Sequence, residues 1–314
     1  MSSTADSGTP FNINQMTASF RARRRHLLPY LIVLPIILYE GLLIVYPIAQ
    51  GIYGSFTRIE LASNRPTVWV GLDNYERMFA DPSFWKMIQT TLIFTVLVII
   101  VALSAGLFTA LLFNRPFRYR PVARGMLMMP WAIPEVPVVM IFIWILSPQF
   151  GVVNILARML PGVTENPQWL QVPGLAMGWM VLISSWKAFP FYSLVILAAL
   201  QAIPRELYEA AKVDGANPLQ LFWHITIPGI ITTLELLAVL ASIFSFKQFT
   251  IIFLMTGGGP SGATETIVIR IFNTAFRFYD YSYAAALGVA GFLISLVVAF
   301  FFIVLQVRRE QEGG

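Results

Sequence analysis

The charged side chains inside long apolar segments are the residues of this sequence that most need a functional explanation. An unpaired charge at the centre of a bilayer costs at least about 2.5–3.5 kcal/mol, so such residues are functional candidates by default. Lys187 is the foremost, because Pro190 follows it and would open the helix ladder toward a cavity. Its aromatic neighbours are Trp186, Phe189, Phe191 and Tyr192. Two interpretations stay open: Lys187 binds a polar or anionic group of a solute, or it pairs with a partner subunit's carboxylate or lines an inner cavity wall.

Four further charges interrupt or border the apolar segments. Glu135 lies next to prolines in a stretch expected to be kinked, and it is a second candidate for a solute path. Glu40 is expected to pair within a subunit interface. Glu235 and Lys247 are twelve residues apart, about three helical turns, so they cannot pair with each other. Structural pairing with other helices is expected for both.

The residue sets that intramembrane enzymes use are missing from these segments. Catalysis needs clustered Ser/His, His/Glu or Asp/Asp groups, and no apolar segment holds such a cluster. The chain has no cysteine, and its two histidines, His26 and His224, are far apart in sequence. Gly257–Gly259 lacks the Lys-Ser/Thr that follows in a phosphate loop, so a turn is expected there. We therefore expect a non-catalytic chain that itself binds no cofactor or metal.

Six apolar segments are long enough to place these charges inside a membrane. The 314 residues are 57% hydrophobic and only 12% charged, whereas soluble domains are about 25% charged. A helix needs about 20 mostly apolar residues to cross a bilayer, and these segments lack the alternation of barrel strands. The expected spans are Leu27–Tyr53, Ile88–Phe113, Gly125–Leu146, Pro173–Leu200, Ile225–Phe246 and Tyr281–Val307. The sequence predicts an all-α integral membrane protein with six transmembrane helices in one domain, residues 27–307.

The basic residues indicate the orientation, because they gather in cytoplasmic loops. The dense runs Arg21–Arg25 and Arg115–Arg124 abut membrane ends on the same side. We therefore expect cytoplasmic tails at both ends, residues 1–26 and 308–314. The second run is expected to contact anionic membrane lipid, and no nucleic-acid partner is expected.

The loop between the fourth and fifth spans, residues 204–228, is expected to lie on the cytoplasmic face as a helix–turn–helix. Pro204 suits a first helical turn, and the acidic residues that follow it favour the positive end of the helix. Gly215 is a natural stop, and Asn217 can cap a second short helix. A pair of alanines leaves the surface shallow, so another protein could approach closely.

This loop carries a family resemblance. The matching residues are Glu209-Ala210-Ala211, Asp214-Gly215-Ala216, Phe222, Ile225 and Ile227-Pro228. They resemble the signature loop of the permeases of ATP-binding-cassette (ABC) importers, which implies a coupling helix that sits in a groove of a separate ATPase. The residues expected to make that contact are Glu206, Glu209, Ala210, Ala211, Asp214, Gly215 and Ala216. Many members have a proline where this chain has Thr232, so a bend at the start of the fifth span is in doubt.

Other patterns resemble the carbohydrate-uptake permeases of the maltose-transporter type, over roughly residues 28–307. They include Tyr46-Pro47, Val70–Tyr75, Asp81–Trp85, Thr256–Pro260 and Ala284–Ala286. Val70–Tyr75 is typical of the first permease of a heterodimeric pair. The resemblance implies import of a sugar, oligosaccharide or polyol through a bacterial inner membrane. It also implies a second homologous permease, two copies of an ATPase that hold ATP and magnesium, and an extracytoplasmic solute-binding protein.

Two alternatives stay open beside this interpretation. One is an ABC importer permease for a solute that is not a sugar. The other is a secondary transporter driven by an ion gradient, which usually has a longer chain with two related halves.

Overall fold

The computed structural model describes residues 30, 32–59 and 67–312, and the chain divides into two compact units, Met1–Tyr53 and Gly54–Gly314. The first apolar helical stretch, Ile32–Ser55, includes the π-helix η1 (Gly41–Val45) and the α-helix α2 (Tyr46–Ser55). It is long enough to cross a membrane, as expected for the first span. The predicted tail 1–26 and residues 313–314 of the C-terminal tail lie outside the described residues.

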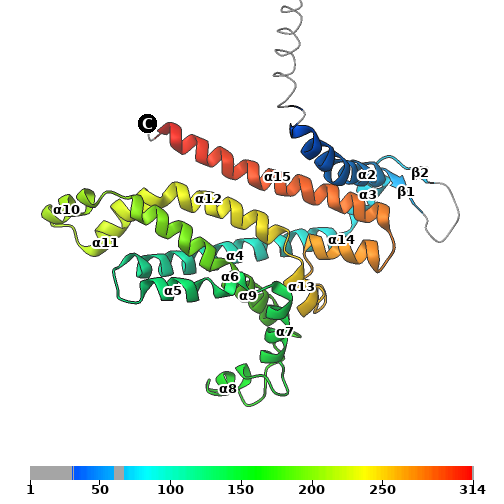
Figure 1. Ribbon diagram of the computed structural model, residues 1–314. Coiled ribbons are helices and arrows are strands. Elements are labelled where there is room, and N and C mark those ends of the chain that lie inside the picture. The colour runs from blue at the N-terminus through cyan, green and yellow to red at the C-terminus, as the bar shows by residue number, and fades with distance from the viewer. Residues whose placement is uncertain (1–29, 31, 60–66, 313–314) are drawn as a thin grey trace, which may run out of the picture. The chain divides into compact units, whose positions relative to one another are not determined.

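Four long apolar helices make the framework of the second unit. They are α4 (Pro82–Asn114), α9 (Pro173–Ala202), α12 (Ile227–Phe246) and α15 (Tyr281–Glu312). The helices α4, α9 and α12 pack against one another (Figure 1). The helix α4 begins six residues before the expected Ile88, because Pro82 occupies its first turn and the Asp81 carboxylate accepts the Ser83 N–H at 2.8 Å. The fourth expected span is reproduced within two residues, and the sixth begins at the expected Tyr281.

The packing of α4 against α9 depends on a glycine. A Cβ atom placed on Gly106 would lie 3.1 Å from the Cβ of Tyr192 and 3.3 Å from the backbone nitrogen of Ser193. The backbones of the two helices therefore approach closely, which is how small residues promote helix association in membranes. Small and aliphatic side chains fill the surrounding core: Ala102, Ala110, Ile196, Leu197, Ile230, Leu237 and Ala241.

The third expected span, Gly125–Leu146, is not one straight helix. The structure divides it into α5 (Arg120–Leu127), α6 (Met129–Ala132) and α7 (Glu135–Ile145), with an 89° bend between the first two and the last. Ile133 has an extended backbone because Pro134 follows it, and a residue before proline avoids the helical region. The described residues thus contain five helices that could each cross a membrane, or six if this bent pair forms one span.

Short elements complete the second unit. They are the antiparallel strands β1 (Thr57–Arg58) and β2 (Val68–Trp69), and the helices α3 (Asp73–Ala80), α8 (Val153–Arg158), α13 (Thr250–Met255) and α14 (Ile267–Phe276). Within the described residues the fold is all-α apart from these two short strands. Ion pairs tie the elements together: Arg77 reaches Asp280 at 2.7 Å, and Arg270 lies 3.5 Å from both Asp81 and Glu265.

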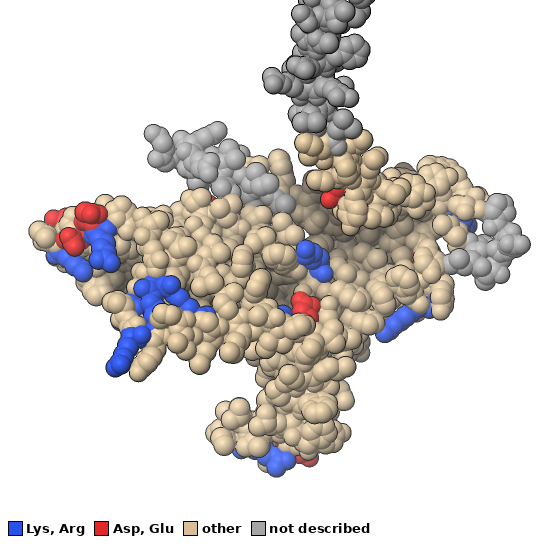
Figure 2. Space-filling view, viewed as in Figure 1, with Lys and Arg blue, Asp and Glu red and all other residues tan. Residues whose placement is uncertain are grey.

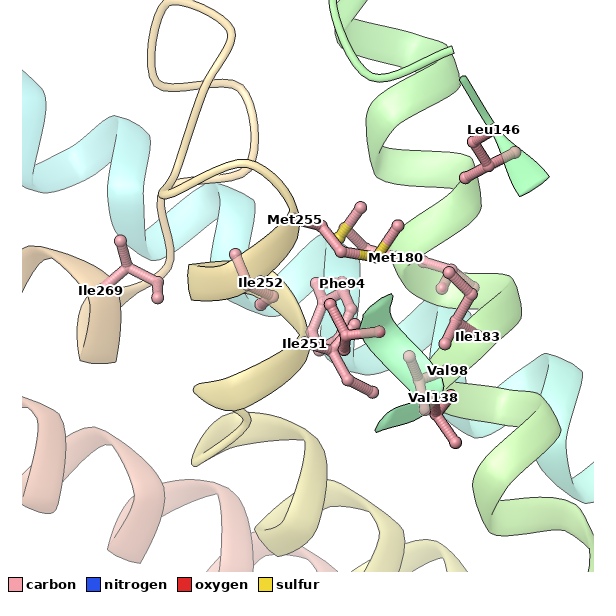
Figure 3. Packing of buried hydrophobic residues seen from close by; sticks show 12 residues of the cluster. Phe94, Val98, Val138, Leu146, Met180, Ile183, Ile251, Ile252, Met255 and Ile269 are labelled. Atoms are coloured by element: carbon pink, nitrogen blue, oxygen red, sulfur yellow. The ribbon is translucent and has the colours of Figure 1, made fainter. Parts of the chain in front are cut away.

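A hydrophobic cluster fixes α7 and α13 against the framework. In Figure 3, Phe94 and Val98 of α4 meet Met180 of α9, Ile251 of α13 and Val138 of α7. All five side chains are buried. Because close-packed interiors resist displacement, this cluster holds both short helices in place beside α9.

Candidate functional site

The helix α10 (Arg205–Val213) stands at one end of the second unit (Figure 1). Pro204 lies at the N-cap position, one residue before the first turn in which the sequence placed it, and Glu206 lies in the first turn as predicted. None of its residues is buried, and Val213 is 88% exposed. Figure 2 shows charged side chains of both signs over this end, whereas the surface of the long helices is almost uncharged. The helix α10 therefore presents a polar surface with an exposed apolar tip.

Gly215 ends α10 with a Schellman turn. Its φ of +85° is a conformation that side chains with a Cβ rarely adopt. The Ala216 N–H donates to the Ala211 carbonyl at 2.9 Å, and the Gly215 N–H donates to the Lys212 carbonyl at 3.0 Å. The seven predicted coupling residues thus lie along α10 and the turn that ends it, and none of them is buried.

Asn217 caps the helix that follows. Its side chain accepts the Gln220 N–H at 3.0 Å, and its own N–H donates to the Gln220 side chain at 2.8 Å. The predicted second short helix, α11 (Pro218–Leu221), runs through the π-helix η2 (Phe222–Thr226) directly into α12. The fifth span therefore begins at Pro218, not at Ile225, and no break separates it from the loop.

Two contacts join α10 and its approach to the start of α12. The hydroxyls of Tyr208 and Thr226 are 3.0 Å apart, and Thr226 also donates to the Leu221 carbonyl at 3.3 Å. Ile203, just before α10, packs closely on Gly229 at the start of α12. A Cβ added to Gly229 would lie 2.7 Å from the terminal methyl group of Ile203. A displacement of α10 would therefore act on α9 through the chain and on α12 through these contacts.

A second candidate site is a cavity of about 550 Å³ between α6, α7, α9 and the turn from α12 to α13. It brings together four of the six residues predicted for a solute path: Glu135, Lys187, Phe191 and Tyr192. The other two, Trp186 and Phe189, lie on another face of α9 and line a separate cavity of about 280 Å³. Their proximity in sequence does not place them together, because a helix turns about 100° per residue.

Lys187 supports the break in the third span. Its ammonium group donates to the Pro130 carbonyl at 3.2 Å and to the Ile133 carbonyl. Both carbonyls lie where the α6 backbone ladder stops, so the lysine satisfies acceptors that the bend leaves open. An ammonium has three donors, and the third remains available beside the cavity. Within the described residues Lys187 forms no ion pair with a carboxylate.

The cavity also contains residues that the sequence did not single out for a solute path. Trp131 of α6 stacks on Phe191, with ring centres 6.2 Å apart and planes inclined by 19°. Lys247, Gln248 and Phe249 enter from the turn after α12. Lys247 was expected to pair with another helix, but in the described part of the chain it forms no ion pair. The sequence feature that could have identified Lys247 as a cavity residue is its position, because a Lys-Gln pair that ends an apolar helix indicates a polar turn inside the fold.

The fold and these two sites define a multi-pass membrane protein of the transporter class. The family model "Binding-protein-dependent transport system inner membrane component" matches residues 102–311. The chain therefore belongs to this family and is an inner-membrane permease of an ABC transporter. The predicted resemblance to ABC importer permeases is confirmed.

Individual relatives match over almost the whole chain. A sulfoquinovosyl glycerol transport system permease of Agrobacterium fabrum is 38% identical, over 87% of this chain and 88% of that protein. A trehalose/maltose transport system permease of Thermococcus litoralis is 32% identical, over 94% and 98% of the two chains. Among solved structures, a bacterial ABC transporter that imports the acidic polysaccharide alginate superposes with a TM-score of 0.78 at 26% identity, covering 93% of this chain and 99% of that one.

Proposed function

We propose that this chain is the permease subunit of an ABC importer that moves a carbohydrate, whether a sugar, an oligosaccharide or a polyol, through the bacterial inner membrane. The relatives support this substrate class, because they include permeases of sulfoquinovosyl glycerol and trehalose/maltose transport systems. The cavity supports it too, since aromatic faces and hydrogen-bonding groups meet in a volume of about 550 Å³. A relative that serves sn-glycerol-3-phosphate keeps a non-sugar solute as the second candidate.

The observation that carries the coupling assignment is the exposure of α10. Its described residues have no buried side chain, and the apolar Val213 projects at its end. Apolar groups exposed on a stiff, capped helix fit a groove on another protein. We assign that groove to a separate ATPase, with Glu206, Glu209, Ala210, Ala211, Asp214, Gly215 and Ala216 at the contact.

The complete importer in this proposal has four kinds of partner. They are a second homologous permease, two copies of the ATPase, an extracytoplasmic solute-binding protein and membrane lipid. The solute-binding protein is supported by the structure of a similar bacterial alginate transporter, which is in complex with a periplasmic protein that holds an alginate pentasaccharide. ATP and magnesium belong to the ATPase subunits, and this chain contributes no hydrolytic group. In this proposal both termini lie in the cytoplasm, as the basic runs of the sequence indicate.

The chain's own contribution is to change shape. Closure of the ATPase pair carries α10, and α10 moves the ends of α9 and α12 that it contacts. The cavity is lined by the middle of α9 and by the far end of α12, so the same movement would change its access from one side of the membrane to the other. The ATPase and the solute then bias the same two conformations, which is coupling in the thermodynamic sense.

The test replaces Glu209 by lysine and, separately, Gly215 by leucine in the transporter reconstituted in vesicles. We expect both variants to insert normally but to lose most ATP-driven uptake and most solute-stimulated ATP hydrolysis. Glu165→Lys is the matched control, because it reverses an exposed charge outside α10. Wild-type coupling in both α10 variants would refute the docking assignment, and uptake that runs on an ion gradient without ATP would favour a secondary transporter.

A further inference from the structure

We propose that the cavity beside Lys187 selects a carbohydrate that bears an anionic group, and that Lys247 recognises the anion. This inference rests on the proposed function, because it names the substrate class of the same import path. Four observations carry it: the charges at the cavity, the freedom of the Lys247 ammonium, two unsatisfied polar atoms in the wall, and the aromatic surface beside them.

The charges at the cavity are predominantly positive. Two of the chain's four lysines line it, Lys187 and Lys247, against one carboxylate, Glu135. Lys187 is anchored by backbone carbonyls, which do not neutralise its charge. Within the described residues no ion pair joins Glu135 to either lysine. A ligand with one negative charge would therefore balance the cavity formally.

The ammonium of Lys247 is available for a ligand. Its nitrogen lies 4.8 Å from the ring centre of Phe244, and the side chain is exposed. In the part of the chain that the structure describes, Lys247 makes neither an ion pair nor a side-chain hydrogen bond. A cation over an aromatic face keeps its N–H donors, so this contact orients the lysine without occupying it.

Two polar atoms of cavity-lining residues have no partner among the described residues. They are the side-chain nitrogen of Gln248, adjacent to Lys247, and the hydroxyl oxygen of Ser184, one turn from Lys187 on α9. Buried polar groups are normally hydrogen-bonded, and each exception calls for an explanation. A hydroxyl thus accompanies Lys187 and an amide accompanies Lys247, and such donors suit the oxygens of a carboxylate, sulfonate or phosphate.

The aromatic side chains of the cavity can bind the carbohydrate part of such a ligand. The ring centres of Trp131 and Phe191 are 6.2 Å apart in a stacked arrangement, and Phe249 lines the cavity from the turn between α12 and α13. The volume of about 550 Å³ lies within the roughly 300–1,000 Å³ typical of small-molecule sites. A sugar ring can lie on the aromatic surface while its charged substituent points to Lys247.

The experiment compares three methyl glucosides that differ only at C6, which carries a hydroxyl, a carboxylate or a sulfonate. Binding is measured by calorimetry on the transporter purified with its partner subunits but without the solute-binding protein, so that only the membrane cavity discriminates. A hydrogen bond to a charged group is stronger than one between neutral groups, which predicts about fivefold to tenfold tighter binding of the charged probes. Lys247→Gln should bring the three affinities together, and Lys247→Arg should keep the preference.

Lys86→Gln is the matched control, because Lys86 bonds the Ser261 carbonyl at 3.1 Å, away from the cavity lining. A preference for the carboxylate or the sulfonate alone supports the proposal and identifies the anion. Equal affinities for all three probes, or a preference that survives Lys247→Gln, would overturn it while leaving ATP-driven uptake intact. Absence of binding by every probe overturns it as well, and loss of ATP dependence in the parallel uptake assay would overturn the proposed function separately.

Discussion

Removing one hydroxyl from Tyr208 should weaken the coupling of α10 to the membrane helices. In Tyr208→Phe the ring stays in place, but the 3.0 Å contact with the Thr226 hydroxyl is lost. Among the described residues this is the one side-chain hydrogen bond between α10 and η2, which belongs to the continuous helix that leads into α12. The change therefore tests the connection and leaves the predicted ATPase contact surface unaltered.

The magnitude follows from the surroundings of Thr226. Its side chain is buried, but it keeps its bond to the Leu221 carbonyl at 3.3 Å, so the variant leaves no orphaned donor on it. A net intramolecular hydrogen bond contributes about 0.5–1.5 kcal/mol. Because about 1.4 kcal/mol corresponds to a factor of ten, we expect a roughly twofold to tenfold loss in the coupling equilibrium.

The assay is the number of solute molecules imported per ATP hydrolysed by the transporter reconstituted in vesicles. We expect Tyr208→Phe to lower this ratio and the stimulation of hydrolysis by solute, while basal hydrolysis is unchanged. Thr226→Val should have a similar effect, and the double variant should be little worse than either single one, because both remove the same contact. Tyr119→Phe controls for loss of an exposed hydroxyl. An unchanged ratio in Tyr208→Phe, or additive losses in the double variant, would refute the proposed route.

Three further predictions address the packing and the orientation. Lys187→Met should destabilise the purified permease by about 1–3 kcal/mol in thermal unfolding, because two backbone carbonyls lose their donor, and Lys187→Arg should retain part of that stability. Gly106→Leu should cost about 1–3 kcal/mol by forcing α4 away from α9, whereas Gly178→Ala, where a Cβ meets nothing within 4 Å, should be nearly neutral. Since the chain has no cysteine, single cysteines at Asp214 and Glu165 should react with an impermeant maleimide from opposite sides of the membrane, and labelling from the same side would contradict the expected orientation.

Local sequence rules were sufficient for α10 and its end. Pro204, Gly215 and Asn217 act through their own backbone or the next few residues, so their roles can be predicted without knowledge of the fold. The long apolar spans were predictable for a similar reason, since the length and composition of a segment decide whether it can cross a membrane.

The cavity could not be predicted in the same way, because its members meet only through tertiary packing. Four of the expected solute-path residues line it, but Trp186 and Phe189 were assigned to it by proximity along the chain and lie on another face of α9. The 89° bend that brings Trp131 to Phe191 depends on where α9 supports the broken segment, through Lys187. Prolines in the sequence indicated a kink, but not its angle or its partner.

The two candidate sites share the same pair of helices, and this gives the proposed coupling a physical route. Lys187 of α9 lies sixteen residues from Ile203, a distance of about 24 Å along a helix. Lys247 ends α12, which spans twenty residues or about 30 Å from Ile227. The cavity lysines thus lie at the middle of α9 and at the end of α12, and both helices contact α10 or its approach at the ends near the loop. If α10 moves with the ATPase as proposed, the displacement would reach α9 through the chain and α12 through the contacts of Tyr208 and Ile203, and so both helices that carry the cavity lysines.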